Sequence, residues 1–330
     1  EGSSQIGGNI ATNAGGIRVL RYGLTRERVA GLKAVTGQGA VINCNRGLVK
    51  NASGYDFRHL FVGSEGTLGL IVEATLRLVE QPQDSRVMLL GVSNLDALMN
   101  VFSVLRSAAR LSAFEFFNRR ALGHVRRATG LAEPFEAQCP FYILTEFDCA
   151  DDAAEQSALN GYERCVEQGW LLDGVISQSG RQAAELWRYR ESISESISHY
   201  LPYKNDLSVA ISRVPDFLHR LDKQIRVHFP DFEILWYGHI GDGNLHMNIL
   251  KPEHMPLEEF ERRCHDISER SYALTEELGG SISAEHGIGL LKQPWLHRVR
   301  SETEIELMQG IKRVFDPAGI LNPGKLLPGR

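Results

Sequence analysis

The sequence has few cysteines, and no two of them stand at metal-binding spacing. Five cysteines occur in 330 residues and none forms a CxxC: Cys44, Cys139, Cys149, Cys165 and Cys264. An odd, scattered set of this kind provides neither a disulfide framework nor a cysteine-rich metal site. We therefore expect most of them to be buried free thiols.

Long apolar runs and an excess of positive charge are also absent. No segment approaches the ~18 uncharged residues that span a bilayer, and the start EGSSQIGGN lacks the profile of a secretory signal. We therefore expect a soluble, intracellular protein, cytoplasmic or, in a eukaryote, mitochondrial. The 36 basic and 41 acidic residues give a net charge of -5, so nucleic acid is not an expected partner.

The chain also lacks an initiator methionine and begins at Glu1 inside a glycine-rich stretch, which predicts an N-terminal truncation. Its length predicts two or more domains. Residues 1–80 are glycine-rich with short β-branched runs, which indicates strands joined by tight turns. The polar segment EQPQD at 80–84 predicts a boundary.

Strand-like and helical segments alternate from residue 85 to about 285, and this pattern indicates an α+β or α/β layer with helices covering one face of a sheet. The strand-like runs are RVMLLGV (86–92), FYILTEFD (141–148), LSVAISRV (207–214) and EILWYGHI (233–240). The helical stretches include 94–108, 151–169, 185–197 and 215–229. One further helix is expected at 302–315, within the last segment 289–330, stopped by Asp316-Pro317.

The stretch GGNIATNAGG places two glycine pairs around small or amide side chains, from Gly7 to Gly16. Such a segment lets the main chain pass close to a flat or phosphorylated ligand, although a glycine-rich turn between strands explains it equally well. It is not a GxGxxG fingerprint between a strand and a helix, so a nicotinamide-binding Rossmann domain is disfavoured.

About fifty residues on, GYDFRHLFVGSEGTLGLI leads into an apolar strand. Together with ATNAGG and the following RYG, it resembles the FAD domain of the FAD-linked oxidase family, in the branch of D-lactate and D-2-hydroxyglutarate dehydrogenases. The resemblance implies a partial FAD-binding domain of the vanillyl-alcohol-oxidase type at 1–80, a substrate cap domain with an antiparallel sheet at 85–288, and a helical segment at 289–330 that returns to the FAD domain. It implies these flavin-lining residues: Gly7, Gly8, Asn9, Thr12, Ala14, Gly15, Gly16, Gly63, Glu65, Gly66, Ile71 and Asn322.

The segment WYGHIGDGNLHMNIL holds His239 and His246 seven residues apart. On a straight strand this odd separation sends side chains to opposite faces, so the glycines between them must allow a turn if the imidazoles converge. Asn248 then shares a face with His246. A lone strand histidine is more often a satisfied core or surface group than a ligand, but SISAEHGIG adds Glu285 and His286. Two imidazoles and a carboxylate suit zinc, manganese or ferrous iron.

The resemblance implies that His239, His246 and Glu285 bind a divalent metal, with zinc foremost and manganese, iron or cobalt as alternatives. Because neighbouring residues on a strand face opposite ways, Glu285 and His286 should have different roles, and the resemblance assigns His286 as general base. The implied reaction is oxidation of a D-2-hydroxyacid, with hydride passing to the flavin. A flavin-free metallohydrolase and a catalytically silent module remain open.

Arg190 lies on an otherwise apolar helical stripe with Leu186, Ile193 and Ile197, and Ser194 follows one turn later. Two structural explanations are open: the guanidinium reaches solvent while its stem packs on apolar residues, or it forms an ion pair with a nearby carboxylate. The functional alternative is that Arg190 binds a carboxylate of the substrate. With Lys204 and Asn248, these residues match positions that the resemblance assigns to the substrate. The trio Arg190, Ser194 and Lys204 favours a dicarboxylate such as D-2-hydroxyglutarate, with D-lactate or glycolate as alternatives. Further implied partners are an electron-transfer flavoprotein or quinone as acceptor, and a homodimer is compatible with the family.

Overall fold

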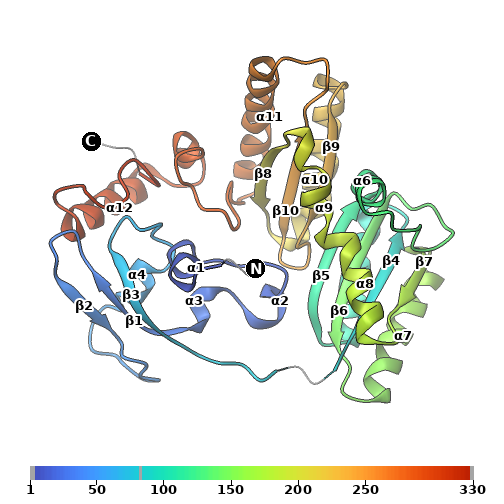
Figure 1. Ribbon diagram of the computed structural model, residues 1–330, viewed down its shortest axis with the longest axis horizontal. Coiled ribbons are helices and arrows are strands. Elements are labelled where there is room, and N and C mark those ends of the chain that lie inside the picture. The colour runs from blue at the N-terminus through green and yellow to red at the C-terminus, as the bar shows by residue number, and fades with distance from the viewer. Residues whose placement is uncertain (1–3, 82–83, 328–330) are drawn as a thin grey trace. The chain divides into compact units, whose positions relative to one another are not determined.

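The computed structural model describes residues 4–81 and 84–327 (Figure 1). Pro82 and Gln83 of the predicted linker, and Pro328 and Gly329 of the tail, lie outside this range. The described chain divides into two compact units. The glycine-rich unit takes the described parts of Glu1–Gly16, Tyr22–Glu80 and Ile282–Arg330, and the sheet unit takes those of Ile17–Arg21 and Gln81–Ser281. The functional domain limits at 80, 85 and 288 stay a prediction.

The glycine-rich unit contains a three-stranded sheet in the order β2-β1-β3, with both pairs antiparallel. Phe61 and Phe315 meet edge to face in its core, with ring centroids 5.4 Å apart. Its strands are β1 (Val29–Val35), β2 (Val41–Cys44) and β3 (Leu70–Leu76). Its helices are α1 (Ile6–Thr12), α3 (Thr25–Arg28), α4 (Arg58–Phe61), η3 (Gln293–Arg298) and α12 (Glu302–Phe315). Helix α2 (Val19–Tyr22) belongs to the sheet unit up to Arg21.

Helix α1 replaces the glycine-rich turn that the sequence allowed as an alternative. Gly7 and Gly8 each weaken a helix by about 1 kcal/mol relative to alanine, but Ile10 buries its side chain in the core. Asn13 then ends the helix in the left-handed region, at φ 52°, and its N–H bonds the carbonyls of Asn9 and Ile10. Burial and capping together offset the poor helix propensity of this segment.

The sheet unit is built on a seven-stranded sheet in the order β7-β4-β6-β5-β9-β10-β8, and every strand pair is antiparallel. The strands are β4 (Ser85–Val92), β5 (Leu111–Asn118), β6 (Phe141–Asp148), β7 (Leu171–Ile176), β8 (Tyr203–Ser208), β9 (Glu233–Gly238) and β10 (Asn244–Leu250). The helical elements are α5 (Leu95–Ala108), α6 (Arg119–Thr129), α7 (Asp152–Glu167), α8 (Gly180–Glu191), α9 (Ile193–Ser196), η1 (Ser198–Tyr200), η2 (Ile211–Arg213), α10 (Val214–His228) and α11 (Leu257–Glu277).

Helices cover both faces of this sheet, so the expectation of one covered face is wrong. On one face α6, α8 and α9 pack on the strands, with Trp187 and Ile193 in a shared core with Phe117. On the other face α5 packs against the sheet, where the rings of Phe102 and Phe114 lie 4.8 Å apart. A strand covered on both faces is buried at successive residues and not only at alternate ones, and this is the pattern of β5, where the first seven residues are buried.

Two further expectations need correction. The run LSVAISRV is not a strand: β8 ends at Ser208, and the chain passes through the 3-10 turn η2 into α10. The helix expected at 185–197 is divided at Ser192, where α8 ends and α9 begins. Arg190 and Ile193 are nevertheless buried, so the stripe itself faces the core as predicted.

All five cysteines are buried and unbridged, which confirms the predicted free thiols. Burial raises the pKa of the Cys264 thiol to about 12. Among the described residues, no helix has the length and apolarity needed to cross a membrane.

Candidate metal and substrate site

His239 and His246 are brought together by the turn that joins β9 to β10. The N–H groups of Asp242 and Asn244 both bond the His239 carbonyl, at 3.1 and 3.2 Å. Gly243 has φ 85°, and a side chain there would also collide with the Val209 carbonyl, so this position requires glycine. The two imidazole rings lie 5.2 Å apart at 88°, and the predicted convergence is confirmed.

Each histidine has a buried carboxylate beside its Nδ1 atom. Glu115 on β5 approaches His239 Nδ1 at 2.7 and 2.8 Å, and Asp206 on β8 lies 3.5 Å from His246 Nδ1. Both carboxylates are almost fully buried. A carboxylate at Nδ1 favours the tautomer in which Nε2 carries a lone pair, and this is the usual support of a metal-binding histidine. The sequence patterns above did not single out Glu115 or Asp206.

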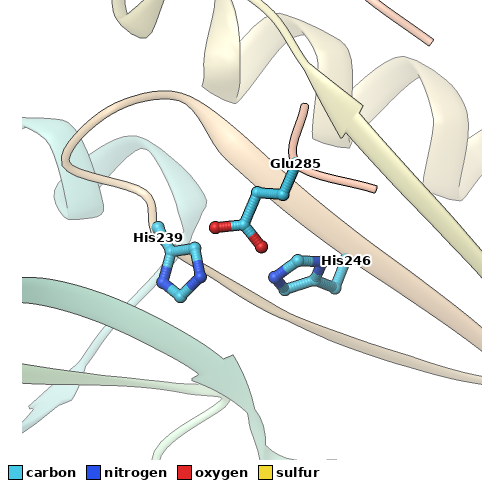
Figure 2. A group of neighbouring side chains, drawn as sticks. All are labelled: His239, His246 and Glu285. Atoms are coloured by element: carbon cyan, nitrogen blue, oxygen red, sulfur yellow. The ribbon is translucent and has the colours of Figure 1, made fainter. Parts of the chain in front are cut away.

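Glu285 supplies the third ligand of the predicted set. Its carboxylate and the two imidazoles are neighbours, with ligand atoms within 4.8 Å of one another (Figure 2). Ser281, four residues earlier, is bridged to Ser208 at the end of β8 by backbone bonds of 2.8 and 2.9 Å. Four residues reach at most about 14 Å, so the chain itself tethers Glu285 near β8. Two nitrogens and one oxygen at this spacing fit a divalent cation with open positions.

Glu285 and His286 do not face opposite ways as predicted. Their ligand atoms lie within 4.8 Å of each other. The reason is local: only Ser281 makes a β-bridge here, and residues 282–287 are bends and coil, so strand alternation does not apply. The Ser283 hydroxyl donates to the Gly287 carbonyl at 2.5 Å, which holds this segment in its bent form.

Arg190 and Ser194 both contact residues of the sheet. The guanidinium donates to Glu115 from Nε at 2.9 Å, and its Nη2 atom forms an ion pair with the same carboxylate at 2.8 Å. It also lies over the Tyr237 ring, 4.7 Å from the centroid. The Ser194 hydroxyl lies 2.9 Å from the Tyr237 hydroxyl. The carboxylate pairing allowed for Arg190 is therefore present, and its predicted substrate role stays a prediction. Tyr237 joins both residues and was not found from the sequence.

Lys204 and Asn248 are direct partners in the register of β8 and β10. Lys204 is exposed on the edge strand, whereas Asn248 is buried and its Oδ1 atom has no hydrogen-bond partner among the described residues. His246 and Asn248 are two residues apart on β10, so their side chains lie on the same face of the sheet, as the sequence predicted. An unsatisfied buried amide oxygen costs about 1–3 kcal/mol, which marks this position as one where a donor from a ligand would be stabilising.

Glu65 has a structural task within the glycine-rich unit. At φ 53° it turns its carboxylate onto the backbone N–H groups of Ile288 and Gly289, both at 2.8 Å. The Asn322 side chain donates to the Glu65 carbonyl. The turn at residues 63–66, with the sequence GSEG, therefore contacts both the backbone that follows His286 and the C-terminal tail.

The predicted flavin-lining positions of α1 and its following turn remain accessible. Cβ atoms built on Gly7 and Gly8 would meet nothing within 4 Å, and residues 11–16 are exposed or half-buried. The Ser64 hydroxyl is buried without a hydrogen-bond partner among the described residues. Open glycine backbone together with an orphaned hydroxyl fits a polar cofactor such as FAD, and the individual contacts stay predictions.

Comparison with family models assigns the two parts of the chain separately. Residues 81–326 match the model "FAD linked oxidases, C-terminal domain", and residues 2–45 match the model "FAD binding domain". The chain therefore belongs to the FAD-linked oxidase family, which confirms the resemblance inferred from its motifs and the α+β fold class that it implied.

Curated relatives share much of the sequence. The D-2-hydroxyglutarate dehydrogenases of Stutzerimonas stutzeri and Xanthomonas citri are 52% and 56% identical over 98% of this chain, which spans 70% and 69% of their lengths. The mitochondrial D-2-hydroxyglutarate dehydrogenase of Danio rerio is 36% identical over 99% of this chain and 61% of its own length.

Solved structures support the same fold. A 4-ethylphenol oxidase from Gulosibacter chungangensis superposes over 98% of this chain and 70% of its own, with a TM-score of 0.70 and 15% identity. A p-cresol methylhydroxylase reaches the same TM-score over 99% of this chain and 70% of its own, at 13% identity.

Proposed function

We propose that this chain carries out the FAD-dependent oxidation of D-2-hydroxyglutarate to the corresponding 2-oxoacid. The observation that carries the proposal is the convergence of His239 and His246, each backed by a buried carboxylate, in a chain of the FAD-linked oxidase family. The identity with the bacterial D-2-hydroxyglutarate dehydrogenases favours this substrate among the D-2-hydroxyacids. The metallohydrolase alternative uses the same ligands but leaves the match to a FAD-binding domain unexplained.

His239, His246 and Glu285 are the residues that would hold a divalent cation, for which we propose zinc. Two imidazoles and one carboxylate are common zinc ligands and leave a position open for substrate. Such a cation would act as a Lewis acid, lowering the pKa of a hydroxyl group that binds beside it. The protein's part is to keep both imidazoles oriented, through Glu115 and Asp206.

Arg190, Ser194 and Lys204 are proposed to bind the distal carboxylate of the substrate. Glu115 accepts a hydrogen bond from Nε and forms an ion pair with Nη2, so the guanidinium keeps donors for a further acceptor. Lys204, exposed on the edge strand β8, adds a positive charge. A monocarboxylate such as D-lactate or glycolate would leave this group of donors unused.

Asn248 and His286 are proposed to act at the reacting carbon. The unsatisfied Asn248 Oδ1 is suited to accept a hydrogen bond from the substrate hydroxyl. His286 is the proposed general base that takes the hydroxyl proton, because the free nitrogen of a neutral imidazole accepts a proton. When bound, FAD supplies the acceptor for the hydride that leaves C2. An electron-transfer flavoprotein or a quinone is the proposed onward acceptor.

The test is dye-linked oxidation of D-2-hydroxyglutarate, D-lactate, D-malate and glycolate by the FAD-loaded chain. We expect Lys204→Met to lower kcat/KM for D-2-hydroxyglutarate about tenfold, since a charged hydrogen bond contributes about 1.5–3 kcal/mol, and to leave glycolate turnover unchanged. Lys223→Met, at an exposed position on α10, is the matched control and should change neither. Equal activity on glycolate and D-2-hydroxyglutarate would contradict the dicarboxylate assignment.

A further inference from the structure

Glu115 is a carboxylate with no exposed surface, in the middle of the seven-stranded sheet. It lies on β5, between β6 and β9, and is the only charged residue in the segment LSAFEFFN. A carboxylate at such a position is strongly destabilising unless charged or hydrogen-bonding partners surround it. Its partners therefore explain why it is there.

Two cationic or donor side chains share this one carboxylate. His239 Nδ1 lies 2.7 Å from Oε1 and 2.8 Å from Oε2. Arg190 donates to Oε2 from Nε at 2.9 Å, and its Nη2 atom forms an ion pair with the same oxygen at 2.8 Å. The register explains the first contact, because Phe117 pairs with Tyr237 and Phe116 with Gly238, so that the next position across from Glu115 is His239.

The contact with His239 determines which ring nitrogen faces outward. A carboxylate only accepts, so Nδ1 must carry the proton and Nε2 keeps its lone pair. A cation can then be bound by Nε2 alone. The contact also prevents rotation of the ring, because both Glu115 oxygens lie within hydrogen-bond distance of Nδ1.

The contact with Arg190 fixes the guanidinium plane. Its Nε donates to Glu115 and its Nη2 forms an ion pair with the same carboxylate oxygen, while its flat face lies on the Tyr237 ring. An arginine held on one edge and one face presents its remaining donors in one direction. The same carboxylate therefore orients a metal-binding imidazole and a guanidinium.

We propose that Glu115 is a positioning residue that joins the two ends of the site: it orients His239 toward a divalent cation and Arg190 toward the distal carboxylate of the substrate. The second half of this statement rests on the proposed function. The first half requires only that the chain binds the cation.

Glutamine is an informative replacement because it has the same shape but only one acceptor atom. If the glutamine oxygen points toward His239, the amide nitrogen points toward the Arg190 guanidinium. Two hydrogen-bond donors then face each other with no acceptor between them. In the opposite orientation the amide donates to Nδ1, and the ring adopts the tautomer with a proton on Nε2, which cannot bind metal. Glu115→Gln thus disturbs at least one partner in either orientation.

Glu146 provides a matched control. It is buried on the neighbouring strand β6, accepts from Trp187 Nε1 at 2.8 Å and pairs with Arg18. Glu146→Gln removes a buried carboxylate charge from the same sheet, at a residue that also contacts helix α8. Its effect on zinc affinity measures the general cost of losing a buried carboxylate.

The experiment titrates zinc chloride into the metal-stripped 330-residue chain against a chromophoric chelator, with circular dichroism to verify folding. We expect Glu115→Gln to weaken zinc binding about 10- to 100-fold, the usual effect of losing such a partner, and Glu146→Gln to change it less than twofold. Zinc affinity of folded Glu115→Gln within twofold of the wild type would overturn the inference and leave the proposed function intact. A wild-type chain that binds no zinc would overturn both.

Glu115→Gln could unfold because Arg190 then loses its counter-charge. The double variant Glu115→Gln, Arg190→Met removes both buried charges and must show the same loss of zinc affinity. In the FAD-loaded enzyme, Glu115→Gln should also raise KM for D-2-hydroxyglutarate about tenfold more than KM for glycolate, because only the longer substrate reaches Arg190. Equal changes in the two KM values would contradict the Arg190 half alone.

Discussion

The hydroxyl group of Tyr237 lies 2.9 Å from the hydroxyl group of Ser194. The ring of the same tyrosine supports the Arg190 guanidinium at 4.7 Å and packs 5.2 Å from the His246 ring. One side chain on β9 thus contacts two proposed substrate residues and one proposed metal ligand.

Tyr237→Phe tests the role of this hydroxyl group. The ring stays in place, so Arg190 keeps its support, but Ser194 loses its partner. We expect KM for D-2-hydroxyglutarate to rise about fivefold, equivalent to the ~1 kcal/mol of one neutral hydrogen bond, with kcat within twofold of the wild type. Tyr142→Phe is the control, because Tyr142 packs on the same face and bonds Arg119 instead. An unchanged KM would rule out a role for the Tyr237 hydroxyl in orienting Ser194.

Glu65→Ala tests whether the GSEG turn holds the segment after His286. The carboxylate bonds two backbone N–H groups, at Ile288 and Gly289, and alanine would release both. We expect faster amide hydrogen exchange at these two positions and a decrease in kcat of about tenfold, since a misplaced base loses proximity. Glu73→Ala removes an exposed pair with Lys33 and should change neither measurement. Unaltered exchange at Ile288 and Gly289 would show that this anchor is dispensable.

Asp316 makes the stability of the glycine-rich unit dependent on pH. Burial by itself raises the pKa of this carboxyl group, but hydrogen bonds from Lys312, Leu321 and Ile320 outweigh it, and the net pKa is lowered. Because the folded pKa is below the unfolded one, this stabilisation is complete at neutral pH and decreases as pH falls below about 4, toward the folded pKa.

The corresponding variant is Asp316→Asn. We expect it to lower the free energy of unfolding at pH 7 by about 1–3 kcal/mol, because charge-assisted bonds at 2.7 and 2.8 Å are lost. The difference from the wild type should shrink in urea titrations carried out at progressively lower pH. A difference that stays constant from pH 7 to pH 3 would mean that the carboxylate charge is not what stabilises this turn.

The sequence predicted the elements whose signals are local. Helix α12 has the predicted bounds, because Ser301 caps it and Asp316-Pro317 stops it. The turn between His239 and His246 was predicted from its glycines, since only a turn lets side chains seven residues apart converge. Both cases depend on backbone rules that act over a few residues.

The support of the site could not be predicted in the same way. Glu115 stands 124 residues before His239, and only the pairing of β5 with β9 brings them together. The one local signal is the charge of Glu115 among the apolar residues of its strand. Such a charge indicates that a buried partner exists, but it does not identify the partner. The prediction that Glu285 and His286 face opposite ways was wrong, because the sequence SISAEHGIG resembles a strand. In the structure this segment forms one β-bridge, at Ser281.

The measurement that tests the account most directly is anaerobic reduction of the flavin in the FAD-loaded chain by D-2-hydroxyglutarate, followed as bleaching of the oxidised flavin absorbance. The wild type with zinc should bleach, and His246→Ala should bleach at least about 100-fold more slowly while still binding FAD. His265→Ala, on α11, is the control. Equal bleaching rates in the wild type and in His246→Ala would contradict the account.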